Sequence, residues 1–359
     1  MSGAPNLPLK FLVIRRDNIG DLVHTTPVFR ALRERFPGAR VDAFVNSYNA
    51  PILEGHPDVD QVHAYTKGKH RNGLGRGWFE RLAQLLRLRR ERYDHVLVAT
   101  PGIHVRQIRT ARFIRPAHIT AFVPPGWKLF GVDQGVEYAS GSERHHVELT
   151  FRILEPFSIT GEPPPPRIAF APEPRAPGAP PTIAVHVSAR KPSSRWPEEN
   201  FAPLMRALHE RHGARFRLFW APGAEEDPRH PGDDAKARRI LEAARGLPVE
   251  PCETVELRAL VSGLAGCDAI VCSDGGAMHI AAAMGLPVVC FFGDSDARRW
   301  RPWAVPHRVL QPESLDVRHV SVEAALDAFD SLATERPFSA PGSTSAAGAP
   351  ATGTRAPSA

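Results

Sequence analysis

The stretch FLVIRRDNIGDLVHTTPVFRAL, residues 11–32, changes from a strand pattern to a helix pattern within a few residues. Its four consecutive apolar residues at 11–14 are typical of a strand that is buried on both faces. An amphipathic helix is predicted from about Leu22 to Arg35, and Gly20 permits a tight turn just before it. Because strands that alternate with helices build parallel sheets, this stretch predicts an α/β protein.

The rest of the first half repeats the same alternation. Strand-like runs are VDAFV (41–45), QVHAY (61–65), HVLVA (95–99) and HITAFV (118–123). Helix-period segments lie around 78–92, 103–113 and 145–154. The pattern predicts one parallel sheet with helices on both faces.

A proline-rich segment separates this half from a second one. Ten of the 27 residues at 155–181 are proline, which suits neither a helix interior nor a sheet interior. Strand patterns then return at 182–187, 215–221, 269–273 and 287–293, and helix patterns at about 197–211, 234–245, 255–265 and from 276. The fold class predicted is α/β, with two Rossmann-like parallel-sheet domains that face one another.

We predict five regions along the chain. These are a flexible N-terminus (1–9), a first Rossmann-like domain (10–154), a proline-rich linker (155–181), a second Rossmann-like domain (182–335) and a disordered tail (336–359). One option left open is that the last helix of the second domain packs back on the first domain.

Composition excludes several classes of protein. The chain has 359 residues, 42% of them hydrophobic and 23% charged, and no run approaches the roughly 18 apolar residues that a membrane span needs. The N-terminal residues do not form a secretory signal, and none of the four cysteines stands in a CxxC pair. We therefore expect a cytoplasmic protein with buried, reduced thiols.

Positive charge is concentrated in one part of the first half. Residues 67–115 contain thirteen Lys or Arg against three acidic residues, whereas the whole chain has a net charge of only +6. This distribution predicts a basic docking surface for an anionic partner. A nucleic acid is not expected, because aromatic and basic residues are not interleaved as a stacking platform requires. The alternative is a solvated helix whose apolar side packs on the sheet.

Two loops at carboxyl ends of predicted strands could bind an anionic ligand. The first holds Asp21; the alternative function of this residue is to cap the helix that follows it. The second is SDGGAMHIAAAMGLPVVCFFGD (273–294), where Gly275 and Gly276 would let a phosphate approach main-chain N–H groups. His279 lies one turn into the next helix and could face the same ligand, or it could be an ordinary surface histidine.

Other catalytic motifs are absent or incomplete. GLGRG (73–77) lacks the third glycine of a dinucleotide fingerprint, and HERH (209–212) lacks the spacing of a zinc protease. No GxxxxGK[ST] or GxSxG sequence occurs. The residues predict neither a metal site nor a bound cofactor.

The two loops together resemble the N- and C-terminal signatures of glycosyltransferase family 9, the heptosyltransferases that build lipopolysaccharide. Further matches, in the family's order over about 10–335, are HHVELTFRIL (145–154), VHVSARKPSSRWPEENFAPL (185–204), WAPGAEED (220–227) and RRWRPW (298–303). The resemblance implies a GT-B fold, in which the first domain binds the acceptor, the second binds a nucleotide sugar, and the active site lies between them.

The resemblance also implies roles for particular residues. Asp21 would be the general base that takes the proton from the acceptor hydroxyl. The acceptor side would comprise Asn18, Gly20, His24 and Thr25. The donor side would comprise Ser188, Lys191, Arg195, Glu225 (or Glu226), Asp274, Gly275, Gly276, Ala277 and His279.

The sequence departs from the family pattern on the donor side. Ser194 stands where the family usually has lysine, so that Arg190, Lys191 or Arg195 would have to contact the phosphates. Gly275 and Ala277 stand where the family usually has threonine and proline. Both differences affect donor recognition.

The resemblance therefore implies an inverting, metal-independent transfer of heptose from ADP-heptose to an acidic glycolipid of the lipopolysaccharide inner core. The basic region 67–115 would face this acceptor and the anionic inner leaflet of the membrane. Two alternatives remain open: a transferase with another nucleotide sugar or a protein acceptor, and a non-enzymatic basic binding protein.

Overall fold

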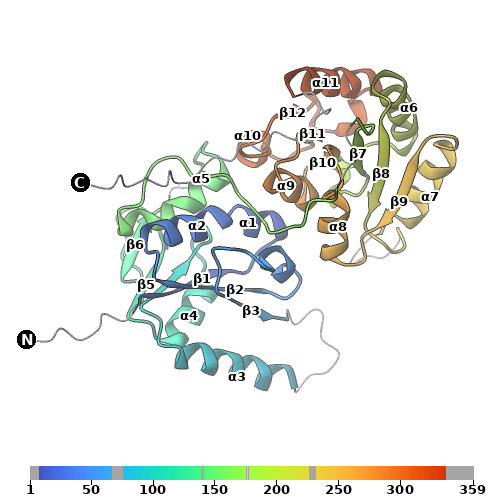
Figure 1. Cartoon of the computed structure of the whole chain (residues 1–359). Coiled ribbons are helices and arrows are strands. Elements are labelled where there is room, and N and C mark those ends of the chain that lie inside the picture. Colours follow the sequence, from blue (N-terminus) through green and yellow to red (C-terminus); the bar gives the residue numbers. More distant parts are fainter. Residues whose placement is uncertain are drawn as a thin grey trace, which may run out of the picture.

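The computed structural model describes residues 8–66, 76–138, 141–174, 176, 178–225 and 232–336. Each half of the chain forms one six-stranded parallel sheet with helices packed around it (Figure 1). The two predicted sheets are therefore confirmed. The termini predicted to be flexible lie almost entirely outside the described residues.

The first sheet has the strand order β3-β2-β1-β4-β5-β6. Its central strand β1 (Lys10–Arg15) pairs with β2 and β4, and its apolar residues at 11–14 are buried alternately in two hydrophobic clusters. The other strands are β2 (Arg40–Asn46), β3 (Gln61–Tyr65), β4 (His95–Val98), β5 (His118–Val123) and β6 (Gln134–Glu137). The short, polar edge strand β6 was not predicted, because QGVE has no apolar run.

The second sheet has the order β12-β11-β10-β7-β8-β9. Its strands are β7 (Thr182–His186), β8 (Arg215–Trp220), β9 (Val249–Glu253), β10 (Ala269–Ser273), β11 (Val288–Phe291) and β12 (His307–Leu310). The edge strands β9 and β12 were not predicted either, because they too lack a continuous apolar run. Neither has a fully buried residue, so no hydrophobic pattern marks them.

The single helix predicted from about Leu22 to Arg35 is in fact two helices, α1 (Ile19–Val23) and α2 (Thr26–Arg35). Pro27 lies in the first turn of α2 and has no N–H to continue a helix from the preceding turn. Two hydroxyl groups stabilise the break, since Thr25 Oγ1 donates to the carbonyl of Asp21 and Thr26 Oγ1 to that of Val23, both at 2.8 Å. Asp21 therefore lies inside α1. The sequence had predicted that it precedes a helix, and this prediction is wrong.

The remaining helices of the first half are α3 (Arg76–Arg90), α4 (Val105–Ile114) and α5 (His146–Phe151). Those of the second half are α6 (Phe201–His212), α7 (Asp234–Ala243), α8 (Leu257–Leu264), α9 (Gly276–Ala283), α10 (Ala297–Trp300) and α11 (Val322–Glu335). Short 3-10 helices are η1 (Ala50–Leu53), η3 (Arg152–Phe157), η4 (Pro192–Ser194), η5 (Glu198–Asn200) and η6 (Val317–His319).

The last helix, α11, packs on the second sheet and α6. Leu326, Phe329 and Leu332 join the buried cluster of the second half, which includes Phe291 of β11. The option that the last helix returns to the first domain is therefore wrong. Its apolar stripe is covered by its own domain.

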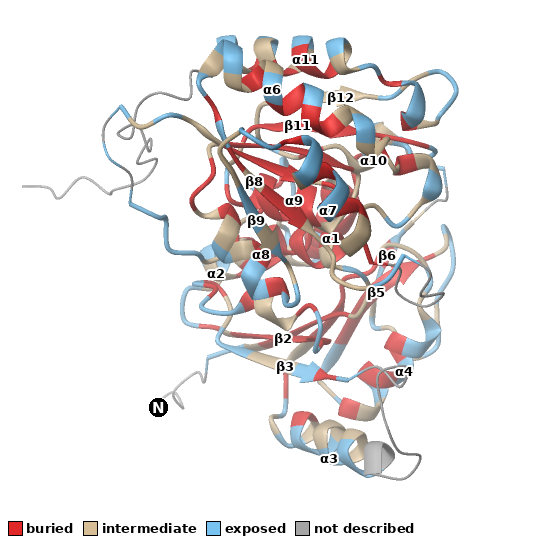
Figure 2. Ribbon diagram, turned by 90° about the vertical axis from the view of Figure 1, so that its right-hand side faces the viewer, coloured by how far each residue is buried: buried red, intermediate tan, exposed pale blue. Residues whose placement is uncertain are grey.

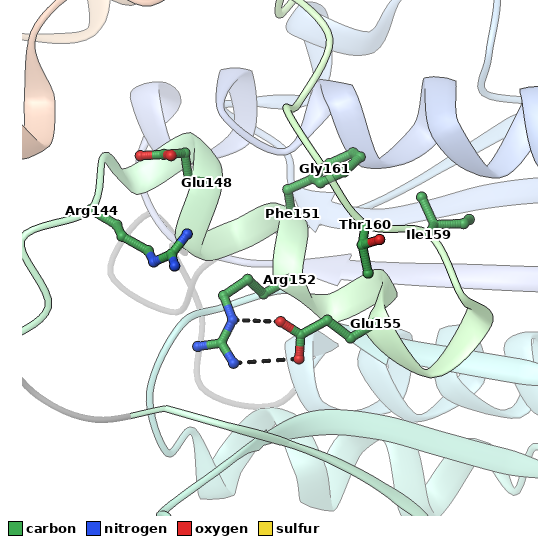
Figure 3. A pocket seen from close by; sticks show the side chains of 8 residues that line it. All are labelled: Arg144, Glu148, Phe151, Arg152, Glu155, Ile159, Thr160 and Gly161. Atoms are coloured by element: carbon green, nitrogen blue, oxygen red, sulfur yellow. Dashed lines mark hydrogen bonds and ion pairs between the residues drawn. The ribbon is translucent and has the colours of Figure 1, made fainter.

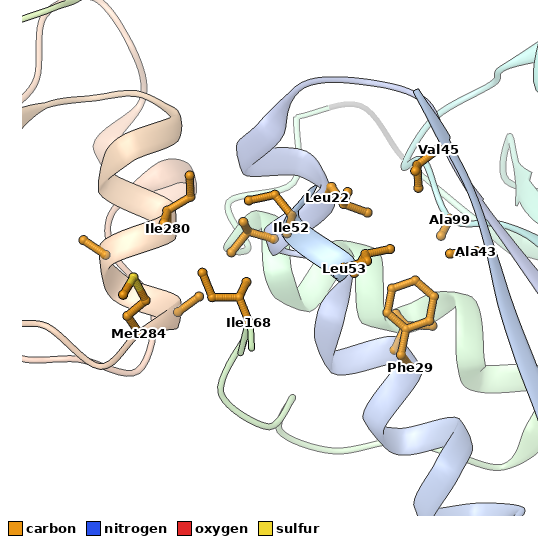
Figure 4. Packing of buried hydrophobic residues seen from close by; sticks show 14 of the residues in the cluster. Leu22, Phe29, Ala43, Val45, Ile52, Leu53, Ala99, Ile168, Ile280 and Met284 are labelled. Atoms are coloured by element: carbon orange, nitrogen blue, oxygen red, sulfur yellow. The ribbon is translucent and has the colours of Figure 1, made fainter. Parts of the chain in front are cut away.

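One hydrophobic cluster continues from the first half into the second. Figure 4 shows Leu22, Ile52 and Ile168 on one side, and Ile280 of α9 and Met284 directly after it on the other. Buried residues also fill the central strands of both sheets (Figure 2). Because the proline-rich segment contributes Ile168 to this contact, it is packed between the halves where it crosses. None of the helices described here is long and apolar enough to span a membrane.

Candidate active site

The two signature loops meet where α1 approaches α9. A Cβ added to Gly20 would lie 2.4 Å from Cδ2 of His279, and one added to Gly276 would lie 3.2 Å from Cβ of Ile19. A side chain at Gly20 would thus collide with the histidine of the opposite half. Gly20 is therefore required for this close approach, and at Gly276 a Cβ would fit only if Ile19 shifted slightly.

Asp21 is held at this junction by contacts to both of its oxygens. Oδ1 accepts a hydrogen bond from Nη2 of Arg15 at 2.8 Å and lies 3.7 Å from Nε2 of His146. Oδ2 accepts the backbone N–H of Asn18 at 3.0 Å, so Asp21 is the third helical residue of a capping box whose N-cap is Asn18, and not itself the N-cap that the sequence suggested. Capping and a catalytic role are compatible, since each oxygen keeps a free lone pair.

The charge around Asp21 favours its ionised form. Burial raises the pKa of this carboxyl group, but Arg15, His146 and the Asn18 N–H together bring the pKa below its ordinary value. Arg15 is itself buried, and it also donates to the carbonyl of Ala99 and lies 3.2 Å from Oδ2 of Asp17. The guanidinium therefore fixes both the position and the charge of the carboxylate.

A cluster of buried imidazoles surrounds the same junction. Nε2 of His24 lies 3.0 Å from Nδ1 of His279, which joins the first half to the second. The ring of His146 stacks on Trp300 of α10 at 4.3 Å between centroids. Burial lowers the pKa of His279 to about 4 and that of His24 well below its usual value, so that both rings are neutral at pH 7. His279 is therefore not a surface histidine.

The predicted donor loop follows β10. Gly275 is the N-cap of α9, and the helix begins at Gly276 and continues through Ala277, so these main-chain N–H groups lie at a helix N-terminus. Burial raises the pKa of Asp274, although Ser295, Lys191 and Arg190 act in the opposite direction. Phosphate oxygens could be bound here by N–H groups and nearby basic side chains.

Lys191 and Arg195 take different directions from the loop after β7. Nζ of Lys191 donates to Oδ1 of Asp294 at 3.0 Å and to Oγ of Ser295 at 3.1 Å, beside the donor loop. Nε of Arg195 instead donates to the carbonyl of Ala189. Ser194 is buried, so that a lysine at this position could not be accommodated without rearrangement. Of the three basic candidates, Lys191 donates to residues of the predicted phosphate site, Arg190 also lowers the pKa of Asp274 there, and Arg195 is bonded within its own loop.

Two further predicted residues follow neighbouring parallel strands, Ser188 after β7 and Glu225 after β8. Oγ of Ser188 accepts the backbone N–H of Ala221 at 2.8 Å, which fixes the loop that follows the strand. Glu225 forms an ion pair with Arg239 of α7 at 3.0 Å. Its alternative, Glu226, lies outside the described residues.

Sequence reasoning missed several residues of the junction. Arg15, His145, His146 and Trp300 all contribute to the cluster around Asp21 and His24. His145 and His146 belong to a stretch that matched the family pattern, but no spacing could assign them to Asp21. Lys236 was also missed: it is buried and donates to the carbonyls of Val187 and Trp196.

A separate pocket of about 440 Å³ lies beside α5 (Figure 3). It is lined by Arg144, Glu148, Phe151, Arg152, Glu155, Ile159, Thr160 and Gly161. Arg152 and Glu155 pair with each other through two hydrogen bonds. None of the predicted site residues lines it, and its charged side chains are of both signs.

The chain is similar to known heptosyltransferases over most of its length. It is 26% identical over 308 residues to lipopolysaccharide heptosyltransferase 3 of Escherichia coli K12, which covers 79% of this chain and 82% of that protein. It is 25% identical to lipopolysaccharide heptosyltransferase 2 of the same strain, over 84% of this chain and 88% of the relative.

Solved structures have the same fold. The glycosyltransferase family 9 protein of Veillonella parvula superposes with a TM-score of 0.72 at 20% identity, covering 93% of this chain and all of that one. An E. coli heptosyltransferase solved with ADP-2-deoxy-2-fluoro heptose also gives 0.72, at 21% identity, covering 90% of this chain and 99% of that one. The predicted GT-B architecture is confirmed.

The sequence profile described as glycosyltransferase family 9 (heptosyltransferase) matches residues 81–319, which contain the donor loop and the whole second sheet. This match agrees with the resemblance of the two signature loops and with the fold. The protein is thus a glycosyltransferase and belongs to glycosyltransferase family 9.

Proposed function

We propose that this enzyme transfers heptose from ADP-heptose to an acceptor sugar of the lipopolysaccharide inner core, with inversion at the anomeric carbon and without a bound metal ion. The observation that carries the proposal is the position of Asp21. Its buried, ionised carboxylate belongs to the predicted acceptor half and lies at the junction with the donor-half histidine His279. Relatives named as lipopolysaccharide heptosyltransferases support the choice of donor and acceptor.

In the proposed reaction, the acceptor oxygen attacks the anomeric carbon of the heptose from the face opposite ADP. The new glycosidic C–O bond forms as the bond from that carbon to the ADP phosphate oxygen breaks. The hydroxyl proton passes to an oxygen of Asp21. A carboxylate of low pKa suffices for this transfer, because the acceptor oxygen becomes acidic only as it bonds to carbon.

The leaving ADP gains negative charge that must be stabilised. We assign this task to the main-chain N–H groups of Gly276 and Ala277 at the start of α9 and to the ammonium group of Lys191. Groups fixed in position before the reaction need little reorganisation when the charge develops.

We further propose that the enzyme works at the cytoplasmic face of the inner membrane, with basic residues of region 67–115 directed toward anionic lipid. Arg87 and Arg90 on the described part of α3 are exposed, and Arg89 is half-buried. Replacing all three with glutamine should weaken binding to vesicles that contain anionic lipid, and unchanged binding would remove the membrane contact from the proposal.

The activity is tested by incubating the purified enzyme with a deacylated inner-core acceptor and ADP-heptose, UDP-glucose or GDP-mannose, each with and without EDTA. We expect transfer from ADP-heptose alone, insensitive to EDTA, and a product of inverted anomeric configuration by NMR. The variant Asp21→Asn should bind ADP normally but lose at least about 100-fold in rate, the lower range for a general base. Full activity of this variant would remove Asp21 as the base, and transfer from another nucleotide sugar would remove the heptose assignment.

A further inference from the structure

A second pocket, of about 410 Å³, lies on the first half between α3 and α4. We name it the arginine pocket; its lining residues are Arg16, Arg81, Leu85, Arg106, Arg109, Thr110 and Phe113. Four of these seven residues carry a positive charge, and none is acidic. α3 packs beside α4 on the side of the sheet away from the second half (Figures 1 and 2).

Two of the arginines are held in place by one aromatic ring. The guanidinium carbons of Arg16 and Arg81 lie 4.3 and 5.6 Å from the ring centroid of Tyr65, a buried residue at the end of β3. Nη1 of Arg16 is 3.4 Å from Oγ1 of Thr110, which in turn donates to the carbonyl of Arg106. Because these contacts already restrict the side chain of Arg16, it would lose less conformational entropy on binding an anion.

Three of the four arginines in the pocket have no carboxylate partner among the described residues. Within the described part of the chain, Arg16, Arg106 and Arg109 form no ion pair with a carboxylate, and the buried Nε of Arg16 makes no hydrogen bond. Arg106 and Arg109 are exposed, so that a ligand can reach them from solvent. Like charges this close repel one another, and a bound anion would relieve the repulsion.

The chemistry of the lining indicates the ligand. Arginine binds phosphate through paired N–H groups, and a phosphate monoester carries between one and two negative charges at pH 7. Several converging arginines therefore match a phosphate better than a single carboxylate. We propose that the arginine pocket is a phosphate-binding site.

The location of the pocket indicates where this phosphate comes from. Arg16 directly follows Arg15, the residue that holds Asp21, so both the pocket and the proposed base lie at the carboxyl end of β1. An acceptor with its hydroxyl at Asp21 could extend a phosphate-bearing part toward Arg106 and Arg109. We therefore assign the phosphate to the glycolipid acceptor, an assignment that rests on the proposed function.

The binding site is tested first with inorganic phosphate alone. Calorimetric titrations are done at saturating ADP, so that the donor site is occupied, on the wild type, on R106Q/R109Q and on the charge-matched control R35Q/R215Q. Arg35 and Arg215 are exposed and lie outside the pocket. We expect phosphate to bind the wild type and the control, with at least about tenfold weaker binding to R106Q/R109Q. Equal binding to all three proteins would overturn the site.

The second arm uses the phosphorylated acceptor glycolipid and the same acceptor treated with phosphatase. Dephosphorylation should raise the KM of the wild type, whereas R106Q/R109Q should already have a raised KM that dephosphorylation increases little further. R106K/R109K, which keeps the charge, should recover part of the affinity, whereas a merely misfolded pocket would not. Equal effects of the glutamine variants on both acceptors would overturn the acceptor assignment.

The two arms separate this inference from the proposed function. If ADP-heptose is not a donor, the titration with inorganic phosphate still decides whether the pocket exists as a site. If phosphate binds but dephosphorylation leaves the KM of the wild type unchanged, the pocket binds free phosphate and the acceptor assignment is wrong.

Discussion

Nε2 of His24 and Nδ1 of His279 lie 3.0 Å apart, and the two residues are 255 positions apart in the sequence. This contact places α1, the helix that carries Asp21, directly against α9, the helix of the donor loop. One ring must donate and the other accept, so the contact requires at least one neutral imidazole. The junction between the halves therefore depends on the protonation state of buried histidines.

Acidification should destabilise this protein between about pH 6.5 and about pH 4. Burial lowers the folded-state pKa of His279 from 6.5 to about 4. In this range the unfolded chain binds more protons than the folded one, so the free energy of unfolding decreases as the pH is lowered. His279 alone accounts for on the order of 3 kcal/mol of this loss. The measurement is the free energy of unfolding in urea at several pH values. The variant H24Q/H279Q should have a shallower pH dependence; an identical slope would contradict the assignment.

Gly20→Ala should destabilise the protein, because the new methyl group would lie 2.4 Å from Cδ2 of His279. We expect a loss of about 1–3 kcal/mol in the free energy of unfolding, the usual cost of overpacking. Gly38→Ala is the matched control, since nothing lies within 4 Å of a Cβ there. Adding His279→Ala to Gly20→Ala should recover part of the loss. A Gly20→Ala variant as stable as the control would show that α1 and α9 can separate without cost.

Replacing Arg15 with methionine should change both stability and the pH profile of transfer. Arg15 is buried and paired with Asp21, so its loss leaves a buried carboxylate without its main counter-charge and should cost about 3–5 kcal/mol. The pKa of Asp21 should rise, since burial raises it and Arg15 is the first opposing group. The base is active when deprotonated, so the acidic limb of kcat/KM should move to higher pH. A lower rate with an unmoved limb would indicate a purely structural role.

Lys191→Gln should weaken ADP binding about tenfold, the effect of losing one charged hydrogen bond. Arg195→Gln should have a smaller effect, because its Nε donates to the carbonyl of Ala189 within its own loop. Calorimetric titration with ADP compares the two variants directly. The opposite ranking would assign the phosphate contact to Arg195.

The order of elements and the family were already predicted from the sequence. FLVI at 11–14 and AIVCS at 269–273 are continuous apolar runs, which only strands buried on both faces require, and both are central strands of their sheets. The glycines at 20 and 275–276 marked the two loops that meet at the junction. Local patterns suffice for these features because the backbone conformation of each segment is set by nearby residues.

Other features depended on contacts between residues distant in sequence. The edge strands have no apolar run, and the contact of His24 with His279, the stacking of His146 on Trp300 and the grouping of Arg16 with Arg106 follow from how the elements pack. No periodicity encodes such a contact. The sequence by itself determined the two sheets, the family and the identity of the candidate base. Only the tertiary structure decided the charge on that base and its partners, because both depend on burial and on side chains brought together from different parts of the fold.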